Sequence, residues 1–387
     1  MARTISCLIV CLLVSTAFAD LGADGIPADP TSTPAPTPAT PAPTEPAKDE
    51  PKETKPADEK QTQKSQEAPE PPVAASKLND FPSLLDAVEW MTPPVDLDRL
   101  YGQTVVVVFV ETWCPTCNGS APDYCRLLQV AAERKPVTII YLGVGLSKPG
   151  FQQYMRSKGL NGHAAGVVSP TVAREFGFGE TLWRAVVINP LGQRVFSGQF
   201  FTYYPKADKK VPVISTDLAD YCGDAEPIVE PPVSSKLGKV DQAIRVGQLG
   251  AALKALARMG DEGKKTHERL LAHGEKLYNV AWSYEKAEPY LAYRLAVVVA
   301  EEYKGEAVAD KAAALAKRLE QDKLVQLGKS GDKKLSQLNA KAVRQPNPNQ
   351  IDAGFKFLTE QYRDCRAGRV AMTALTTPLE SDNKDGE

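Results

Sequence analysis

The chain has 387 residues, a formal net charge of −2, 31 prolines and seven cysteines. This length suits about two folded domains, and the hydrophobic share of 43% is close to the average of globular proteins. The nearly balanced charge argues against a broadly basic nucleic-acid-binding protein, and seven cysteines are too few for a disulfide scaffold of this size.

Residues 1–19 have the pattern of a secretory signal peptide. A positive start precedes an apolar run at residues 5–14, and small residues form a cleavage site before Asp20. The run is short for a stable membrane span, which needs ~20 residues. We therefore expect an exported protein of the periplasm or cell envelope, soluble or tethered. Cleavage leaves five cysteines, so at least one is unpaired or pairs between chains: Cys114, Cys117, Cys125, Cys222 and Cys365.

Residues 20–76 contain 13 of the 31 prolines and no aromatic residue. Alanine, threonine, glutamate and lysine supply most of the rest, so the segment cannot bury enough apolar surface to offset its ordering entropy. We predict a disordered, extended linker with polyproline character. Binding by a proline-reading partner is the alternative.

Residues 77–200 alternate predicted strands and helices. The β-branched run at 105–110 favours a strand buried on both faces, and a helix-compatible stretch follows at 121–134. The further expected elements are a strand at 137–144, a helix at 149–158, a strand at 164–168, a helix at 170–176, and a hairpin of strands at 185–188 and 193–197. This order predicts an α/β fold in which helices flank a mixed sheet.

The C-terminal part of the chain changes to helical periodicity. Residues 201–235 read as an irregular surface connector, and residues 236–366 as an all-α domain of helical hairpins. We expect three or four antiparallel helices up to residue 345, a last helix at 351–366, and a disordered tail at 367–387. Residues 249–256 and 292–303 resemble helices of tetratricopeptide repeats, with a plain bundle as the alternative. Either form would offer a surface for a protein partner.

The segment Trp113-Cys114-Pro115-Thr116-Cys117 lies between the first long strand and the helix after it. At a helix N-terminus the backbone N–H groups and the helix dipole stabilise a thiolate, which favours Cys114 as a nucleophile. Cys117 lies one turn further on, within disulfide reach, so the pair can exchange disulfides with a substrate. A zinc site would need a second CxxC or a histidine pair at ligand spacing, and the sequence has neither. The other alternative to a redox-active pair is an inert structural disulfide. The sequence thus predicts a redox-active disulfide, with no metal and no other cofactor.

Residues 94–200 resemble the thioredoxin superfamily, and within it the exported thiol-disulfide oxidoreductases of the TlpA/ResA type. The matching residues are Phe109, Trp113, Cys114, Cys117 and Pro122 around the CxxC, and Ile188, Asn189, Pro190 and Gly192 in the hairpin. The resemblance implies a thioredoxin fold with Cys114 as the attacking thiol and Cys117 as the resolving thiol.

Three residues beside the motif depart from this pattern or add to it. Counting back from the hairpin places Trp183 at the position of the family's cis-proline, which normally faces the cysteine pair. Arg184 resembles an arginine of peroxiredoxins, but their Pro-x-x-x-Thr-x-x-Cys pattern is missing. Glu111 either assists proton transfer or is a solvated strand-end residue. Outside the motif, Cys125 is either a buried apolar residue or a partner of Cys222, and we expect Cys365 to be an isolated thiol.

The sequence as a whole predicts an exported thiol-disulfide oxidoreductase of the protein-disulfide reductase type. Its partners would be cysteine-containing exported proteins and an unknown electron donor. The alternative is an envelope scaffold protein, in which a weakly active thioredoxin domain accompanies partner-binding helices.

Overall fold

The computed structural model of the protein describes residues 87–113, 115–176, 183–200, 202–204, 209–211, 213–231, 233–344 and 347–377. The predicted signal peptide, the proline-rich linker, Cys114 and the last ten residues of the predicted tail lie outside these ranges. The described residues all belong to one compact unit. None of their helices combines the length and hydrophobicity that a membrane crossing requires.

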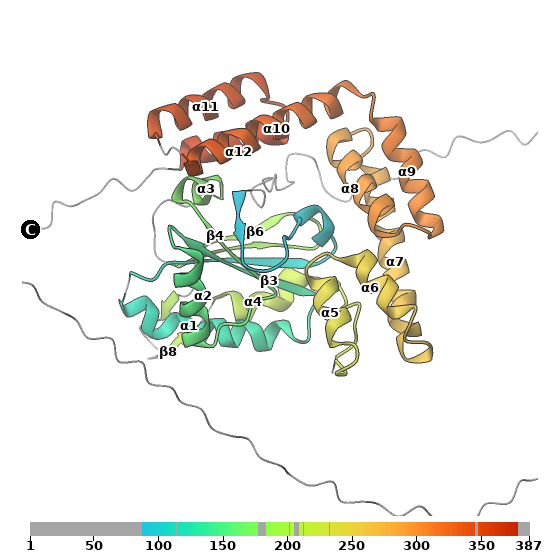
Figure 1. The fold of residues 1–387 in the computed structure, drawn as a ribbon, viewed down its shortest axis with the longest axis horizontal. Helices are drawn as coiled ribbons and strands as arrows, with labels where there is room; N and C mark the ends of the chain where they lie inside the picture. The colour runs from blue at the N-terminus through green and yellow to red at the C-terminus, as the bar shows by residue number, and fades with distance from the viewer. Residues whose placement is uncertain are drawn as a thin grey trace, which may run out of the picture. The chain divides into compact units, whose positions relative to one another are not determined.

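A mixed six-stranded sheet forms the N-terminal half (Figure 1). Its strands lie in the order β1-β4-β3-β2-β5-β6, and β2, β3 and β4 are parallel while the other three run antiparallel to their neighbours. The strands are β1 (Glu89–Trp90), β2 (Thr104–Val110), β3 (Val137–Val144), β4 (Ala164–Val168), β5 (Arg184–Ile188) and β6 (Arg194–Gln199). The predicted strands are therefore confirmed, and β1 and the last two residues of β6, Gly198 and Gln199, add to them.

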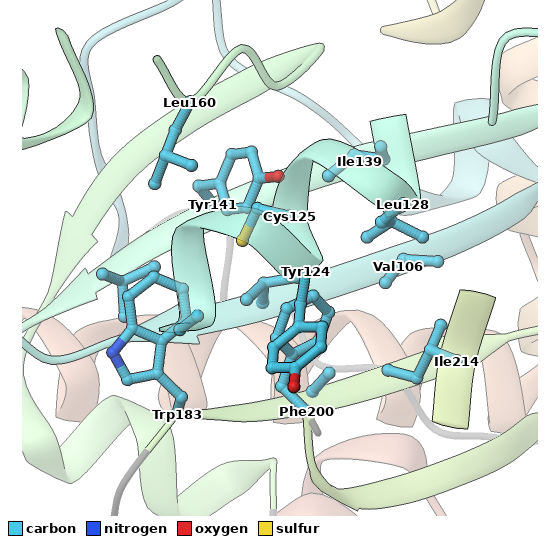
Figure 2. Packing of buried hydrophobic residues seen from close by; sticks show 14 of the residues in the cluster. Val106, Tyr124, Cys125, Leu128, Ile139, Tyr141, Leu160, Trp183, Phe200 and Ile214 are labelled. Carbon is cyan, nitrogen blue, oxygen red and sulfur yellow. The ribbon is translucent and has the colours of Figure 1, made fainter. Parts of the chain in front are cut away.

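Strand β2 is buried along its whole length because helices cover both faces of the sheet. Successive side chains alternate between two separate cores. Val106, Val108 and Val110 join the core under α1 (Pro115–Ala132), α2 (Lys148–Lys158) and α4 (Val213–Cys222) (Figure 2). Val105, Val107 and Phe109 join the core under α3 (Pro170–Glu175) and the short 3-10 helix η3 (Leu97–Leu100). This is the thioredoxin-like fold that the sequence predicts.

Residues 201–235 are not the irregular connector that we expected from the sequence. Strands β7 (Thr202–Tyr204) and β8 (Lys209–Val211) pair with each other, and α4 follows them. Three side chains of α4 are buried in the core beside α1: Ile214, Leu218 and Cys222. The segment contains tyrosines and prolines that obscure its periodicity, so only the packing against α1 reveals that α4 completes a layer over the sheet.

The C-terminal half consists of more helices than the sequence predicts. They are α5 (Gly238–Arg245), α6 (Leu249–Leu256), α7 (Asp261–Ser283), α8 (Pro289–Glu302), α9 (Ala307–Leu319), α10 (Lys323–Arg344), α11 (Pro348–Gln361) and α12 (Arg366–Thr376). The expected helix at 351–366 ends at Gln361, and α12 occupies residues where we expected a disordered tail. Its buried residues pack against α10 and α11 and form an apolar core with them.

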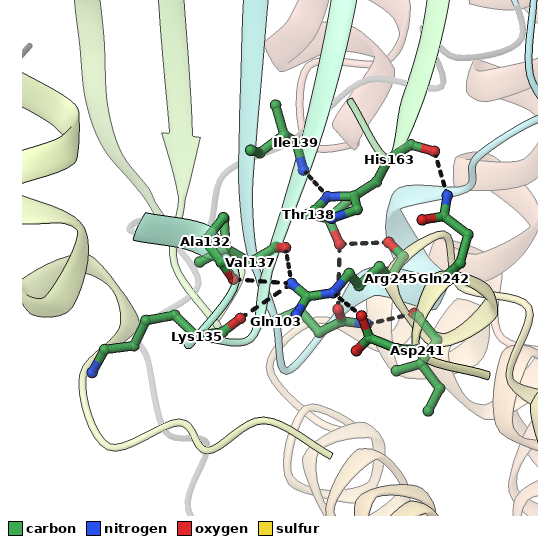
Figure 3. A network of polar contacts seen from close by, with 11 residues as sticks. Gln103, Ala132, Lys135, Val137, Thr138, Ile139, His163, Asp241, Gln242 and Arg245 are labelled. Carbon is green, nitrogen blue, oxygen red and sulfur yellow. Dashed lines mark hydrogen bonds and ion pairs between the residues drawn. The ribbon is translucent and has the colours of Figure 1, made fainter. Parts of the chain in front are cut away.

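A buried polar network joins α5 to one end of the sheet (Figure 3). Arg245 is 6% exposed, and its guanidinium donates to the carbonyl oxygens of Ala132, Lys135 and Val137 and pairs with Asp241. Thr138 donates in turn to the carbonyl oxygen of Arg245. Because a buried charge needs all its partners in place, this network holds α5 in one position on the sheet.

A second buried contact connects α3 with the last three helices. The side chain of Arg174 pairs with Asp352 of α11 at 3.1 Å and donates to the carbonyl oxygen of Ala374 in α12 at 3.0 Å. The neighbouring Glu175 is fully buried, and this burial raises its pKa well above the usual value, which the amide of Asn339 in α10 opposes only in part. The sheet and the C-terminal helices are thus joined through specific polar contacts as well as apolar ones.

Candidate active site

The CxxC segment lies at the carboxyl end of the central strand of the sheet. Strand β2 ends at Val110, and α1 begins at Pro115, directly after Cys114. Pro115, Thr116 and Cys117 form the first residues of α1, whereas Cys114 lies outside the described residues. A proline suits the first position of a helix because its missing N–H has no acceptor there. The order of strand, CxxC and helix therefore agrees with the sequence prediction.

Glu111 connects two tryptophans beside this segment. The indole N–H of Trp113 donates to Glu111 Oε2 at 3.0 Å, and the indole N–H of Trp183 donates to the backbone oxygen of Glu111 at 2.9 Å. Glu111 is 3% exposed, so the solvated alternative for this residue is wrong. Its carboxylate is held against the segment that leads into the CxxC.

The two tryptophans differ in exposure. Trp113 is 67% exposed, which leaves a large apolar ring on the surface next to the cysteines. Trp183 is 1% exposed, and its ring lies 6.3 Å from the ring of Phe200 between centroids (Figure 2). The ring of Tyr154 lies 6.4 Å from the ring of Trp183. Trp183 directly precedes β5, as the count along the sequence predicts, and its ring is part of the core.

Arg184 directly follows Trp183. It is the first residue of β5 and pairs in register with Phe109 of β2. Because side chains alternate along a strand, Arg184 shares a face with Val186, on the side of the sheet that α3 covers. The structure thus brings Glu111, Trp113 and Trp183 together, and it places Arg184 on the face of the sheet opposite the core that contains Trp183.

Asn118 and Tyr154 are neighbours of the motif that the sequence analysis missed. Asn118 Nδ2 donates to the backbone oxygen of Thr112 at 2.5 Å, and the hydroxyl of Tyr154 in α2 donates to Asn118 Oδ1 at 2.8 Å. Asn118 directly follows Cys117, which is the one sequence signal that points to it. These bonds connect the residues on both sides of the CxxC and tie them to α2.

The three other cysteines of the described chain are buried free thiols. Burial raises the pKa of Cys125 to about 12, against an opposing hydrogen bond to Tyr141, and also raises the pKa values of Cys222 and Cys365. Thr104 Oγ1 lies 3.3 Å from Cys222 Sγ. Of the two alternatives for Cys125, the structure therefore supports a buried apolar residue, and it shows no disulfide with Cys222. Raised pKa values leave little thiolate at neutral pH, which makes these thiols poor nucleophiles.

Residues 75–195 match the family model described as Redoxin. The match identifies this part of the chain as a redoxin domain. The match includes β1 to β5, α1 to α3 and the whole CxxC segment, and it ends within β6. The comparison with curated protein sequences gave no significant match.

Several solved structures are similar to part of the chain. A thioredoxin-family thiol:disulfide interchange protein from Chlorobium tepidum is 22% identical, with 34% of this chain and 86% of that chain covered and a TM-score of 0.26. MTB DsbF is 19% identical, with 30% and 87% covered and a TM-score of 0.26. A secreted disulfide oxidoreductase of Mycobacterium tuberculosis is 17% identical, with 36% and 96% covered and a TM-score of 0.26.

Proposed function

We propose that the protein is an exported thiol-disulfide oxidoreductase and that Cys114 and Cys117 of its redoxin domain exchange disulfides with cysteine-containing proteins. The observation that carries this proposal is the position of the CxxC within the redoxin match, after the buried strand β2 and at the start of α1. The free N–H groups at a helix N-terminus favour the thiolate form of the first cysteine. The signal-peptide pattern at residues 1–19 supports export.

The proposed exchange takes two steps. The Cys114 thiolate attacks one sulfur of a substrate disulfide, which forms a mixed disulfide and releases the other substrate sulfur as a thiolate. The Cys117 thiolate then attacks Cys114 Sγ, which releases the second substrate thiol and leaves a Cys114–Cys117 disulfide. Two electrons pass to the substrate, and a dithiol electron donor returns them to the protein in the reverse exchange.

The buried position of Trp183 bears on substrate binding. Since its ring is buried near those of Tyr154 and Phe200, the exposed ring beside the CxxC is that of Trp113. The bond from Trp113 to the Glu111 carboxylate fixes the orientation of this ring. We infer that Trp113 supplies the apolar surface against which a substrate peptide rests while its disulfide is exchanged.

The test is disulfide reduction by the full chain, because Arg245 of α5 is bound into the end of the sheet and a fragment without it loses that support. We expect a reversible two-electron transition of the CxxC between ~−120 and −300 mV in a redox buffer. Cys114→Ser abolishes reduction of a protein disulfide, and Cys117→Ala accumulates mixed disulfides.

Cys125→Ala is the matched control, since this buried thiol takes no part in the exchange and its loss leaves the rate unchanged. Full activity in Cys114→Ser, or a cysteine pair that never forms a disulfide, refutes the proposed function. Mass spectrometry of the exported protein should find Asp20 at its N-terminus.

A further inference from the structure

A cavity of about 160 Å³ lies between the redoxin sheet and the C-terminal helices, away from the CxxC. On the sheet side it is lined by Val105, which is the second residue of β2, whereas the CxxC follows the far end of that strand. The apolar part of its lining comes from Leu97, Leu100, Val105, Ile188, Leu291 and Leu324. The opposite wall is formed by the start of α8 and the start of α12.

Three arginines line this cavity: Arg294, Arg366 and Arg369. Arg294 pairs with Asp98 at 3.3 Å, and Arg369 pairs with Glu288 at 3.7 Å. The side chain of Arg366 is 9% exposed and reaches its acid, Asp332, only at 3.5 Å.

The Nε atom of Arg366 is buried and has no hydrogen-bond partner within the described residues. A buried guanidinium N–H without an acceptor is costly. Its position in the cavity wall therefore marks a place for an anionic oxygen.

Two helix N-termini lie in the same wall. The first residues of α8 and of α12, which have 14 and 11 residues, both line the cavity. The N-cap residues Glu288 and Cys365 make no side-chain capping bond to their helices. Helix N-termini attract anions through their N–H groups and dipole, so the start of α12 acts in the same direction as Arg366, whereas the Glu288 carboxylate offsets this effect at α8.

We propose that this cavity binds a small organic monocarboxylate, with its carboxylate on Arg366 at the start of α12 and its apolar body against Leu100, Val105 and Ile188. A cavity of ~150 Å³ lined by apolar side chains accommodates benzene, so the body is a single ring or a branched chain of similar size. Asp98, Glu288 and Asp364 also line the cavity and would repel a ligand with several negative charges. Because both walls contact it, the ligand stabilises the packing of the helices on the sheet.

Isothermal titration of the full chain with sodium phenylacetate tests this proposal. We expect saturable binding with a Kd of about 1 mM or lower, the range for a ligand of this size. Arg366→Gln weakens binding by about 10-fold or more because it removes the charged donor. The matched control Arg318→Gln, a 58% exposed arginine on α9 outside the cavity, leaves the Kd unchanged.

A second variant keeps the proposal testable if Arg366→Gln does not fold. Leu324 is 47% exposed at the cavity, so Leu324→Trp closes the cavity from its surface side and should abolish binding. Benzyl alcohol, which has the ring but no carboxylate, should bind at least about 10-fold more weakly than phenylacetate. The proposal is overturned if phenylacetate shows no saturable binding up to about 20 mM, if benzyl alcohol binds equally well, or if Leu324→Trp leaves the Kd unchanged.

Discussion

Replacement of Arg245 by alanine should strongly destabilise the protein, because its buried side chain joins α5 to the sheet. The guanidinium Nη1 lies 3.2, 3.2 and 2.7 Å from the carbonyl oxygens of Ala132, Lys135 and Val137, and Nε lies 2.7 Å from Asp241 Oδ2. Removing one partner of a buried ion pair costs about 3–5 kcal/mol because the other charge stays buried and unpaired. The total stability of a folded protein is only about 5–15 kcal/mol, so Arg245→Ala removes a large share of it.

Equilibrium urea unfolding, followed by tryptophan fluorescence, measures this loss. Trp183 lies in the core of the sheet and Trp282 against a core of the helices, so the signal reports on both halves of the protein. The matched control is Arg318→Ala, which removes an exposed pair with Glu285 and should cost about 0–1 kcal/mol. If Arg245→Ala lowers the free energy of unfolding no more than Arg318→Ala does, the network is not what holds α5 on the sheet.

Three further predictions concern buried titratable groups. In the reduced native protein at pH 8, iodoacetamide should modify Cys114. The three buried cysteines should stay unmodified until urea is added, because burial raises the pKa values of Cys125, Cys222 and Cys365. Equal rates of alkylation for all four cysteines in the native state would contradict this. Burial also raises the pKa of Glu175, so the folded state binds a proton that the unfolded state loses above pH ~4.5, and stability decreases with rising pH. Glu175→Gln should remove this decrease when unfolding free energies at pH 5 and pH 8 are compared, and an unchanged difference would refute it. Burial lowers the pKa of His273 from 6.5 to about 4, so between these two pH values the unfolded state binds a proton that the folded state does not. Stability therefore decreases as the pH falls, by up to about 1.4 kcal/mol per pH unit. In His273→Gln the free energy of unfolding should change less with pH over this range, and an identical change would count against a neutral buried histidine.

The site was predictable only in part. The CxxC, the strand before it and the position of Trp183 directly before β5 follow from local sequence and from a count along the chain. The partners of Glu111 do not, because its contact with Trp183 joins residues 72 positions apart. The hydrogen bond from Tyr154 to Asn118 likewise depends on how α2 packs beside α1.

The sequence by itself determined the strands of the redoxin sheet, since long β-branched runs such as 105–110 have few other ways to bury every side chain. It also determined the helical character of the C-terminal half through its 3.6-residue periodicity. Only the tertiary structure decided that α4 covers the sheet beside α1, that Arg245 and Arg174 join the two halves, and that Arg366 lines a cavity between them. Local patterns report which face of an element is apolar, but the partner of that face, or of a buried charge, is set by elements far away in the chain.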